Sequence, residues 1–208
     1  MALSGVFFQR HAQAHSEMLQ LHPNVVPLYL YLIAMEAGLF FYVSRAGLRR
    51  AGIKASELIG GRWTNAKDVL VDAVLALGLW GCWRLIEASW IRWLGPGHAK
   101  SIQTLLPRGP LEILLWIGVS ISAGICEEFV FRGYFQKQFA VFTHSRWIAL
   151  LLQSLLFGIA HGYQGIQACL RISVFGLLYG SLALWRNSLR PGMMAHAASD
   201  ILSGIFGI

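Results

Sequence analysis

The sequence predicts an all-α membrane protein, a polytopic bundle of about six transmembrane helices. Hydrophobic residues make up 56% of the chain and charged residues only 13%, whereas a soluble domain usually carries about 25% charged residues. The mean hydropathy is +0.55. Eight Trp and six Tyr also suit a bilayer, because their amphipathic rings settle at the headgroup level. The net charge of +7 therefore indicates loops that face anionic lipid, and no nucleic-acid partner is expected.

Six apolar segments each approach the roughly 20 residues that a helix needs to span a bilayer. They cover residues 25–44, 69–91, 111–140, 146–163, 168–186 and 191–208. Pro110, Gly165 and Pro191 stand near segment starts, where such residues interrupt a helical pattern. The sequence shows no internal repeat. We therefore expect a polar N-terminal arm over residues 1–24 and one membrane domain over residues 25–208.

Basic residues are distributed unequally between the two ends of the predicted bundle. The end that carries the loop after the first segment has ten: Arg45, Arg49, Arg50, Lys54, Arg62, Lys67, Lys137, Arg146, Arg186 and Arg190. The opposite end has five: Arg10, Arg92, Lys100, Arg108 and Arg171. The positive-inside rule places the first loop in the cytoplasm and both termini outside. We expect a multi-pass protein of a prokaryotic plasma membrane.

Three pairs of residues, each four positions apart, lie in three different apolar segments. The first pair consists of an acidic and a basic residue. Glu128 and Arg132 have the spacing and order that favour an ion pair on a helix. Glu127 is the adjacent residue, so its side chain points about 100° away. This leaves the Glu127 carboxylate free to act as a general base. The alternative is that both acids merely neutralise Arg132 and nearby groups.

The second pair is Phe157 and His161. If the third and fourth segments form an antiparallel hairpin that turns near Thr143, Glu127 lies sixteen residues before the turn and His161 eighteen after it. At 1.5 Å per residue the two side chains differ in depth by only ~3 Å. We therefore expect them to meet inside the bundle, with Phe157 packed over the imidazole or forming the cavity wall.

The third pair is His196 and Asp200. Asp200 can accept a hydrogen bond from one imidazole nitrogen, which would leave the other nitrogen directed into the cavity. The depth of this pair is a difficulty, because His196 is five residues past Pro191, ~8 Å along a helix, whereas Glu127 is ~24 Å from its turn. Either the last segment begins well inside the membrane or this pair lies in a shallower layer.

Other ionisable residues also stand within apolar segments. Arg84 and Glu87 are three apart and are predicted to pair with each other. Arg171 is close enough to a segment start for its guanidinium to reach the membrane surface. Glu36 and Asp72 are interpreted as groups in or behind the cavity.

The three motifs in this order resemble those of the intramembrane CAAX-protease and bacteriocin-processing family, often called CPBP. The pattern is Glu-Glu-x-x-x-Arg, then Phe-x-x-x-His, then His-x-x-x-Asn or Asp, and it covers residues 112–207 here. The run CEEFVFRGYF at residues 126–135 is similar to the family's first motif beyond its charged positions, and Gly133 follows the arginine as it usually does in the family.

The resemblance implies an intramembrane endopeptidase of the glutamic type, which acts on peptides or proteins in the membrane. Glu127 and His161 would activate a water molecule for attack on the peptide carbonyl. Glu128, Arg132 and Phe157 would shape the site. No cofactor is expected for such a mechanism.

The last motif would stabilise the oxyanion in this family. His196 and Asp200 occupy its two positions, although Asp200 departs from the Asn of some members. An ionised Asp cannot donate a hydrogen bond to an oxyanion, so its expected task is to hold His196.

Two other readings stay open. Glu127, His161 and His196 are suitable zinc ligands, although the HExxH signature of helical zinc proteases is absent. A non-proteolytic membrane protein, either a scaffold or a proton relay or transporter, would also place Glu and His inside a bundle. The substrate and the oligomeric state do not follow from the sequence.

Overall fold

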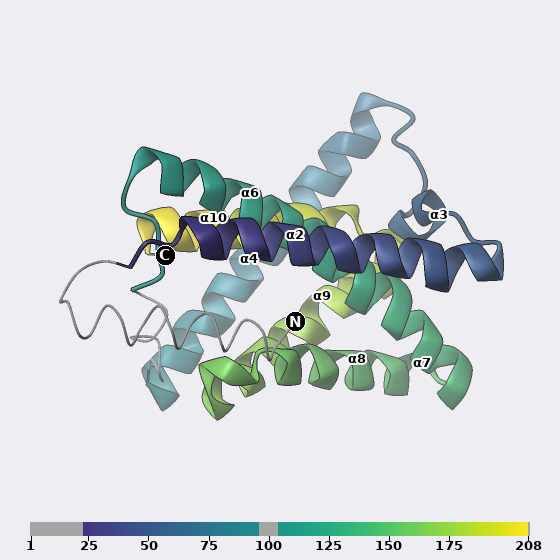
Figure 1. Cartoon of the computed structure of the whole chain (residues 1–208). Coiled ribbons are helices and arrows are strands. Elements are labelled where there is room, and N and C mark those ends of the chain that lie inside the picture. Colours follow the sequence, from purple (N-terminus) through teal and green to yellow (C-terminus); the bar gives the residue numbers. More distant parts are fainter. Residues whose placement is uncertain (1–22, 96–103, 208) are drawn as a thin grey trace.

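The computed structural model describes residues 23–95 and 104–207. Residues 1–22 of the predicted N-terminal arm lie outside the described residues. Within the described ranges the chain is helical and contains no β-strand (Figure 1). Its larger elements are α2 (Val26–Tyr42), α3 (Ala55–Ile59), α4 (Ala66–Leu94), α6 (Pro110–Glu127), α7 (Gln136–Thr143), α8 (Arg146–Ala160), α9 (Ile166–Arg186) and α10 (Arg190–Phe206). The π-helices η1 (Val43–Leu48) and η3 (Glu128–Phe135) and the 3₁₀ turns η2 (Arg49–Ala51) and η4 (Gly162–Gln164) complete the order.

The predicted all-α membrane bundle is confirmed. Four continuous helical stretches are long and apolar enough to cross a membrane: Val26–Leu48, Ala66–Leu94, Pro110–Thr143 and Ile166–Arg186. The other two predicted segments form the shorter helices α8 and α10, of 15 and 17 residues. The chain is therefore an integral membrane protein, and the second and third motifs lie on or directly after these two shorter helices.

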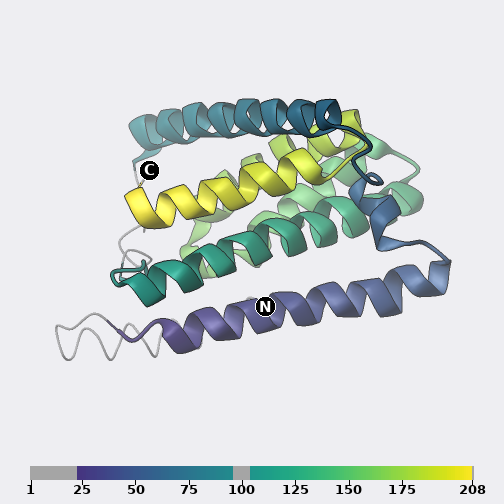
Figure 2. The ribbon, with the colours of Figure 1, turned by 90° about the horizontal axis from the view of Figure 1, so that it is seen from above.

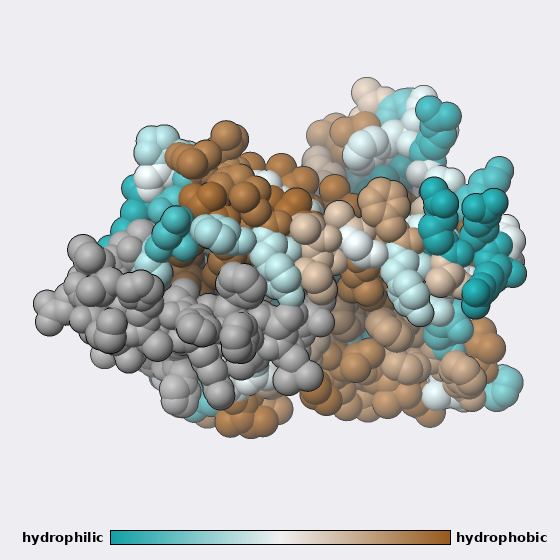
Figure 3. Space-filling model, in the orientation of Figure 1, coloured by the Kyte–Doolittle hydropathy of each residue, from teal (hydrophilic) through white to brown (hydrophobic). Residues whose placement is uncertain are grey.

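Four helices lie side by side in the order α2, α6, α10 and α4 (Figure 2). The remaining pair, α8 and α9, packs together on one side of this row and completes the bundle (Figure 1). Large apolar side chains cover much of the outer surface (Figure 3). Hydrophilic side chains gather at the end where α2 runs on toward α3 (Figure 3). An apolar outer surface on a helical bundle is what contact with lipid requires.

The predicted hairpin between the third and fourth segments is present. The helical stretch that begins at Pro110 ends at Thr143, and α8 begins at Arg146. The turn contains His144 with a φ of 52°. The Ser145 hydroxyl caps α8 by accepting a hydrogen bond from the backbone N–H of Ile148 at 3.4 Å, which satisfies one of the free donors at the helix start.

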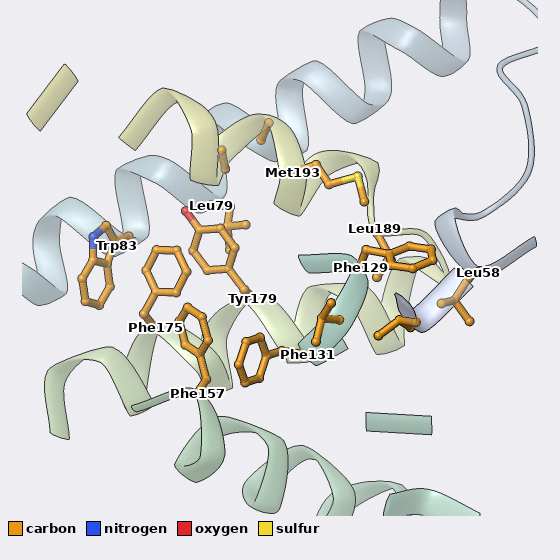
Figure 4. Packing of buried hydrophobic residues seen from close by; sticks show 14 of the residues in the cluster. Leu58, Leu79, Trp83, Phe129, Phe131, Phe157, Phe175, Tyr179, Leu189 and Met193 are labelled. Carbon is orange, nitrogen blue, oxygen red and sulfur yellow. The ribbon is translucent and has the colours of Figure 1, made fainter. Parts of the chain in front are cut away.

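An aromatic core lies between η3, α8, α9, α4 and α10 (Figure 4). Its labelled members are Leu58, Leu79, Trp83, Phe129, Phe131, Phe157, Phe175, Tyr179, Leu189 and Met193. Close approach of α6 and α10 depends on Gly124. A Cβ atom there would lie 2.8 Å from the backbone nitrogen of Ala197 and 2.9 Å from the carbonyl oxygen of Met193. This contact brings the first and third motifs together.

Candidate active site

A cavity of about 400 Å³ lies inside the bundle. Side chains from α2, α4, α6, α8, α9 and α10 line it. Its wall includes Glu127, His161, His196 and Asp200, which are the four residues to which the sequence assigned a catalytic role. The structure therefore brings all three motifs to one place.

Glu128 lies behind the cavity wall and joins the first motif to the third. Its side chain is 1% exposed, and its Oε1 atom lies 3.2 Å from Nη1 of Arg132. The predicted pair of Glu128 and Arg132 is thus confirmed. The same Oε1 atom accepts a hydrogen bond from Nδ1 of His196 at 2.9 Å. One buried carboxylate therefore holds both the arginine and the imidazole.

The prediction that Asp200 holds His196 by a hydrogen bond is wrong. Oδ2 of Asp200 lies 3.7 Å from Nε2 of His196, and Oε2 of Glu127 lies 3.8 Å from the same atom. Helical spacing places Asp200 near the ring, but Glu128 reaches Nδ1 from the neighbouring helical stretch. The result is an imidazole fixed at Nδ1, with Nε2 between two carboxylates that line the cavity.

Arg132 is enclosed by aromatic rings. Its guanidinium carbon lies 4.0 Å from the centre of the Phe157 ring, 5.7 Å from that of Phe175 and 6.0 Å from that of Tyr179. A guanidinium attracts the face of an aromatic ring, and this offsets part of the cost of its burial. Phe157 thus contacts the cation of the first motif.

Phe157 also packs edge-on against His161, with ring centres 4.8 Å apart. The predicted packing of these two rings is confirmed. His161 follows the last residue of α8, and its Nδ1 donates a hydrogen bond to the Phe157 carbonyl oxygen at 2.9 Å. Nδ1 must carry the proton in this contact, which leaves Nε2 as the nitrogen able to act on a ligand.

Glu127 and His161 share the cavity but make no hydrogen bond with each other in the part of the chain that the structure describes. The Glu127 side chain is 15% exposed. Both groups are thus open to a ligand in the cavity. Their expected connection through a water molecule stays a prediction.

The depth of His196 is explained by a recessed start of α10. A Cβ atom on Gly192, in the first turn of α10, would lie 3.2 Å from Oε2 of Glu128, so the helix begins beside the first motif. Figure 2 shows α10 starting short of the end that α2 reaches. Of the two possibilities left by the sequence, the deep start is the one observed.

Contacts with α3 and α4 hold this start in place. The backbone N–H of Leu189 donates to the carbonyl oxygen of Ile59 at 2.9 Å. Asp72 of α4 pairs with Arg186 at 3.1 Å and Arg190 at 3.0 Å. Asp72 lies in this ion cluster and not in the cavity wall, so of the two predicted positions, in the cavity or behind it, the first is wrong.

Three further charged residues line the cavity: Glu36, Glu87 and Arg171. Glu36 of α2 is buried, and the hydroxyl of Ser122 donates a hydrogen bond to its carboxylate. This agrees with the interpretation of Glu36 as a cavity group. Arg171 of α9 also lines the cavity and pairs with Glu87 of α4, so its guanidinium is directed toward α4.

Glu127, His161 and His196 are the residues that the sequence offers as zinc ligands. Across residues 23–95 and 104–207, no three His, Cys, Asp or Glu side chains are arranged to hold a metal ion. The Nδ1 atoms of both histidines are occupied by protein acceptors, so any ligation would fall to Nε2. The present arrangement is therefore not a preformed zinc site, and chelation can test zinc dependence directly.

The comparisons with known proteins agree with the motifs. The model of the Rce1-like family, described as type II CAAX prenyl endopeptidase Rce1-like, matches residues 109–202. No curated protein and no solved structure matches the chain. The matched segment begins next to α6 and ends within α10, so it contains all three motifs.

Proposed function

We propose that this chain is an intramembrane endopeptidase in which Glu127 and His161 activate the attacking water. The match of residues 109–202 to the model of the Rce1-like family, type II CAAX prenyl endopeptidases, supports this proposal. The family supports an intramembrane protease that acts on membrane-associated proteins. The observation that carries the assignment of residues is the shared cavity, whose wall holds residues of all three motifs: Glu127, His161, His196 and Asp200.

Glu127 is the proposed general base. Its carboxylate is open to the cavity, while the adjacent Glu128 is committed to Arg132 and His196. A water molecule placed between Glu127 and Nε2 of His161 would lose a proton to the carboxylate as its oxygen attacks the peptide carbonyl carbon. The same proton is then available to the leaving amine when the carbon–nitrogen bond breaks.

His196 is the proposed oxyanion stabiliser. Glu128 fixes its ring through Nδ1, so Nε2 is held toward the cavity. When Nε2 carries a proton it can donate to the oxygen that becomes negative in the tetrahedral intermediate. A donor fixed in advance in a site of low dielectric stabilises that charge more than water does. Asp200 places a carboxylate 3.7 Å from the same nitrogen.

The test is cleavage of membrane peptides by the full chain in detergent, followed by mass spectrometry. We expect new peptide ends with the unaltered protein and none with Glu127→Gln, which keeps the shape of the side chain but cannot accept the proton. Glu57→Gln is the matched control, because Glu57 is an exposed residue of the short helix α3. Cleavage that persists at full rate in Glu127→Gln would refute the proposed base. Proton-coupled uptake in liposomes without any cleavage would favour the relay function.

A further inference from the structure

A charged triad of Arg84, Glu87 and Arg171 lies at the cavity, and two of its members line the wall. It has no task in the mechanism proposed above. Nη1 of Arg84 lies 2.5 Å from Oε2 of Glu87, which confirms the predicted pair within α4. Nη1 of Arg171 lies 3.5 Å from the other oxygen of Glu87. Glu87 and Arg171 line the same cavity as Glu127 and the two histidines.

The triad contains two guanidinium groups and one carboxylate, so it carries one positive charge in excess. The 3.5 Å pair is longer than a good N–H···O hydrogen bond of about 2.7–3.2 Å. Glu87 is therefore bound mainly by Arg84, and Arg171 keeps donor capacity that a ligand can use. A cation inside a membrane bundle is costly unless it has a partner or contact with water, which makes an anionic ligand favourable here.

Arg171 also differs in charge from its surroundings. It is the only Lys or Arg among the described residues that line the cavity, whereas Glu36, Glu127 and Asp200 are acidic. It lies one helical turn before Phe175, about 6 Å along α9. The Phe175 ring centre is 4.9 Å from that of His196. A peptide whose scissile bond is held at His196 could thus place an anionic group on Arg171, and that group would lie within a few peptide residues of the bond.

We propose that Arg171 binds a carboxylate of the substrate and selects peptides that carry one near the scissile bond. The planar guanidinium matches the two oxygens of a carboxylate, and such charge-assisted bonds are short and strong. The carboxylate can be the C-terminus of the peptide or an acidic side chain. This inference rests on the proposed function, because it states which peptides the proposed protease cavity would select.

Binding of product-like peptides tests the inference without catalysis. The probe is N-acetyl-trileucine with a free C-terminal carboxylate, compared with its C-terminal amide, on full-length Glu127→Gln protein in detergent. Trp83 and Trp116 line the cavity, so their fluorescence can report occupancy. We expect the free acid to bind about tenfold more tightly or better than the amide, as expected for a hydrogen bond to a charged group. N-acetyl-Leu-Glu-Leu amide tests a side-chain carboxylate as the source.

Substitutions then assign the preference to Arg171. In Arg171→Gln the ratio of affinities for acid and amide should fall to about one, and Arg171→Lys should restore part of it. Arg92→Gln is the control, because Arg92 is an exposed arginine near the C-terminal end of α4 and does not line the cavity. In this variant the ratio of affinities for acid and amide should equal that of the protein without the substitution.

If Arg171→Gln does not fold, Glu87→Gln replaces it. Removal of the competing carboxylate should strengthen binding of the acid. Equal binding of acid and amide to protein with Arg171 present, or an acid preference that survives in Arg171→Gln, would overturn the inference. Failure of the proposed function is a separate result, because it would appear as absence of cleavage in the mass-spectrometric assay whatever the peptide terminus.

Discussion

Nδ1 of His196 lies 2.9 Å from Oε1 of Glu128, although 68 residues separate the two in the chain. The imidazole of the third motif is therefore held by the first motif and not by the acid one turn along its own helix. This contact joins the ion pair behind the cavity to the ring that faces it. Substitutions at Glu127, Glu128 and Asp200 should consequently have different effects.

Glu128→Gln should reduce both stability and activity. A neutral amide leaves the guanidinium of Arg132, whose side chain is 0% exposed, without its charge partner. Breaking a buried ion pair costs about 3–5 kcal/mol. We expect a lower yield and a lower Tm of the purified protein, together with loss of cleavage.

Glu127→Gln provides the comparison for that result, because its side chain is partly exposed to the cavity and holds no buried cation. Its yield and Tm should stay close to those of the unaltered protein while cleavage falls by about 100-fold or more, the scale of a lost general base. A full loss of stability in Glu127→Gln, with a stable and inactive Glu128→Gln, would reverse the two roles.

Asp200→Asn should be tolerated better than either glutamate substitution. Asp200 lies 3.7 Å from Nε2 of His196 and its side chain is 39% exposed, so the substitution breaks no hydrogen bond to the imidazole. An Asn amide can also donate to an oxyanion, which an ionised Asp cannot. We expect kcat within about tenfold of the unaltered protein. A loss of activity equal to that of Glu127→Gln would show that the charge of Asp200 is essential.

Gly124→Ala should separate α6 from α10. The added Cβ would lie 2.8 Å and 2.9 Å from backbone atoms of α10, which cannot move aside as a flexible side chain can. Overpacking of this kind costs about 1–3 kcal/mol. We expect a lower Tm and a fall in kcat, because the displacement lengthens the contact between Glu128 and His196.

Gly118→Ala is the matched control for the same helix. Its Cβ would meet only Cδ1 of Ile33, at 3.4 Å, which is close to ordinary van der Waals contact. Its Tm and cleavage rate should stay near those of the unaltered protein. Equal effects of the two substitutions would indicate a general sensitivity of α6 and not a requirement for close packing at Gly124.

Chelation tests the zinc alternative. If Glu127 and His161 activate water without a metal, prolonged treatment with a chelator should leave the cleavage rate unchanged, and elemental analysis of the active protein should find no stoichiometric zinc. Activity that is lost on chelation and restored by zinc would instead assign Glu127, His161 and His196 as ligands.

Several parts of the site could be predicted from the sequence because they depend on short-range geometry. Helical spacing relates Glu128 to Arg132 and Phe157 to His161, and both contacts are observed. The common depth of Glu127 and His161 follows from equal lengths of helix on either side of one turn at Thr143. Apolar segments of known length likewise determine an all-α membrane bundle.

Features that depend on contacts between distant segments were decided by the tertiary structure alone. The start of α10 lies beside Glu128, where the end of α3 at Ile59 binds Leu189, and no periodicity in the last segment encodes that depth. The choice of Glu128 over Asp200 as partner of His196, and the direction of Arg171 into the cavity, have the same origin. Helical periodicity specifies which side chains share a face, whereas the packing of one helix on another determines what that face meets.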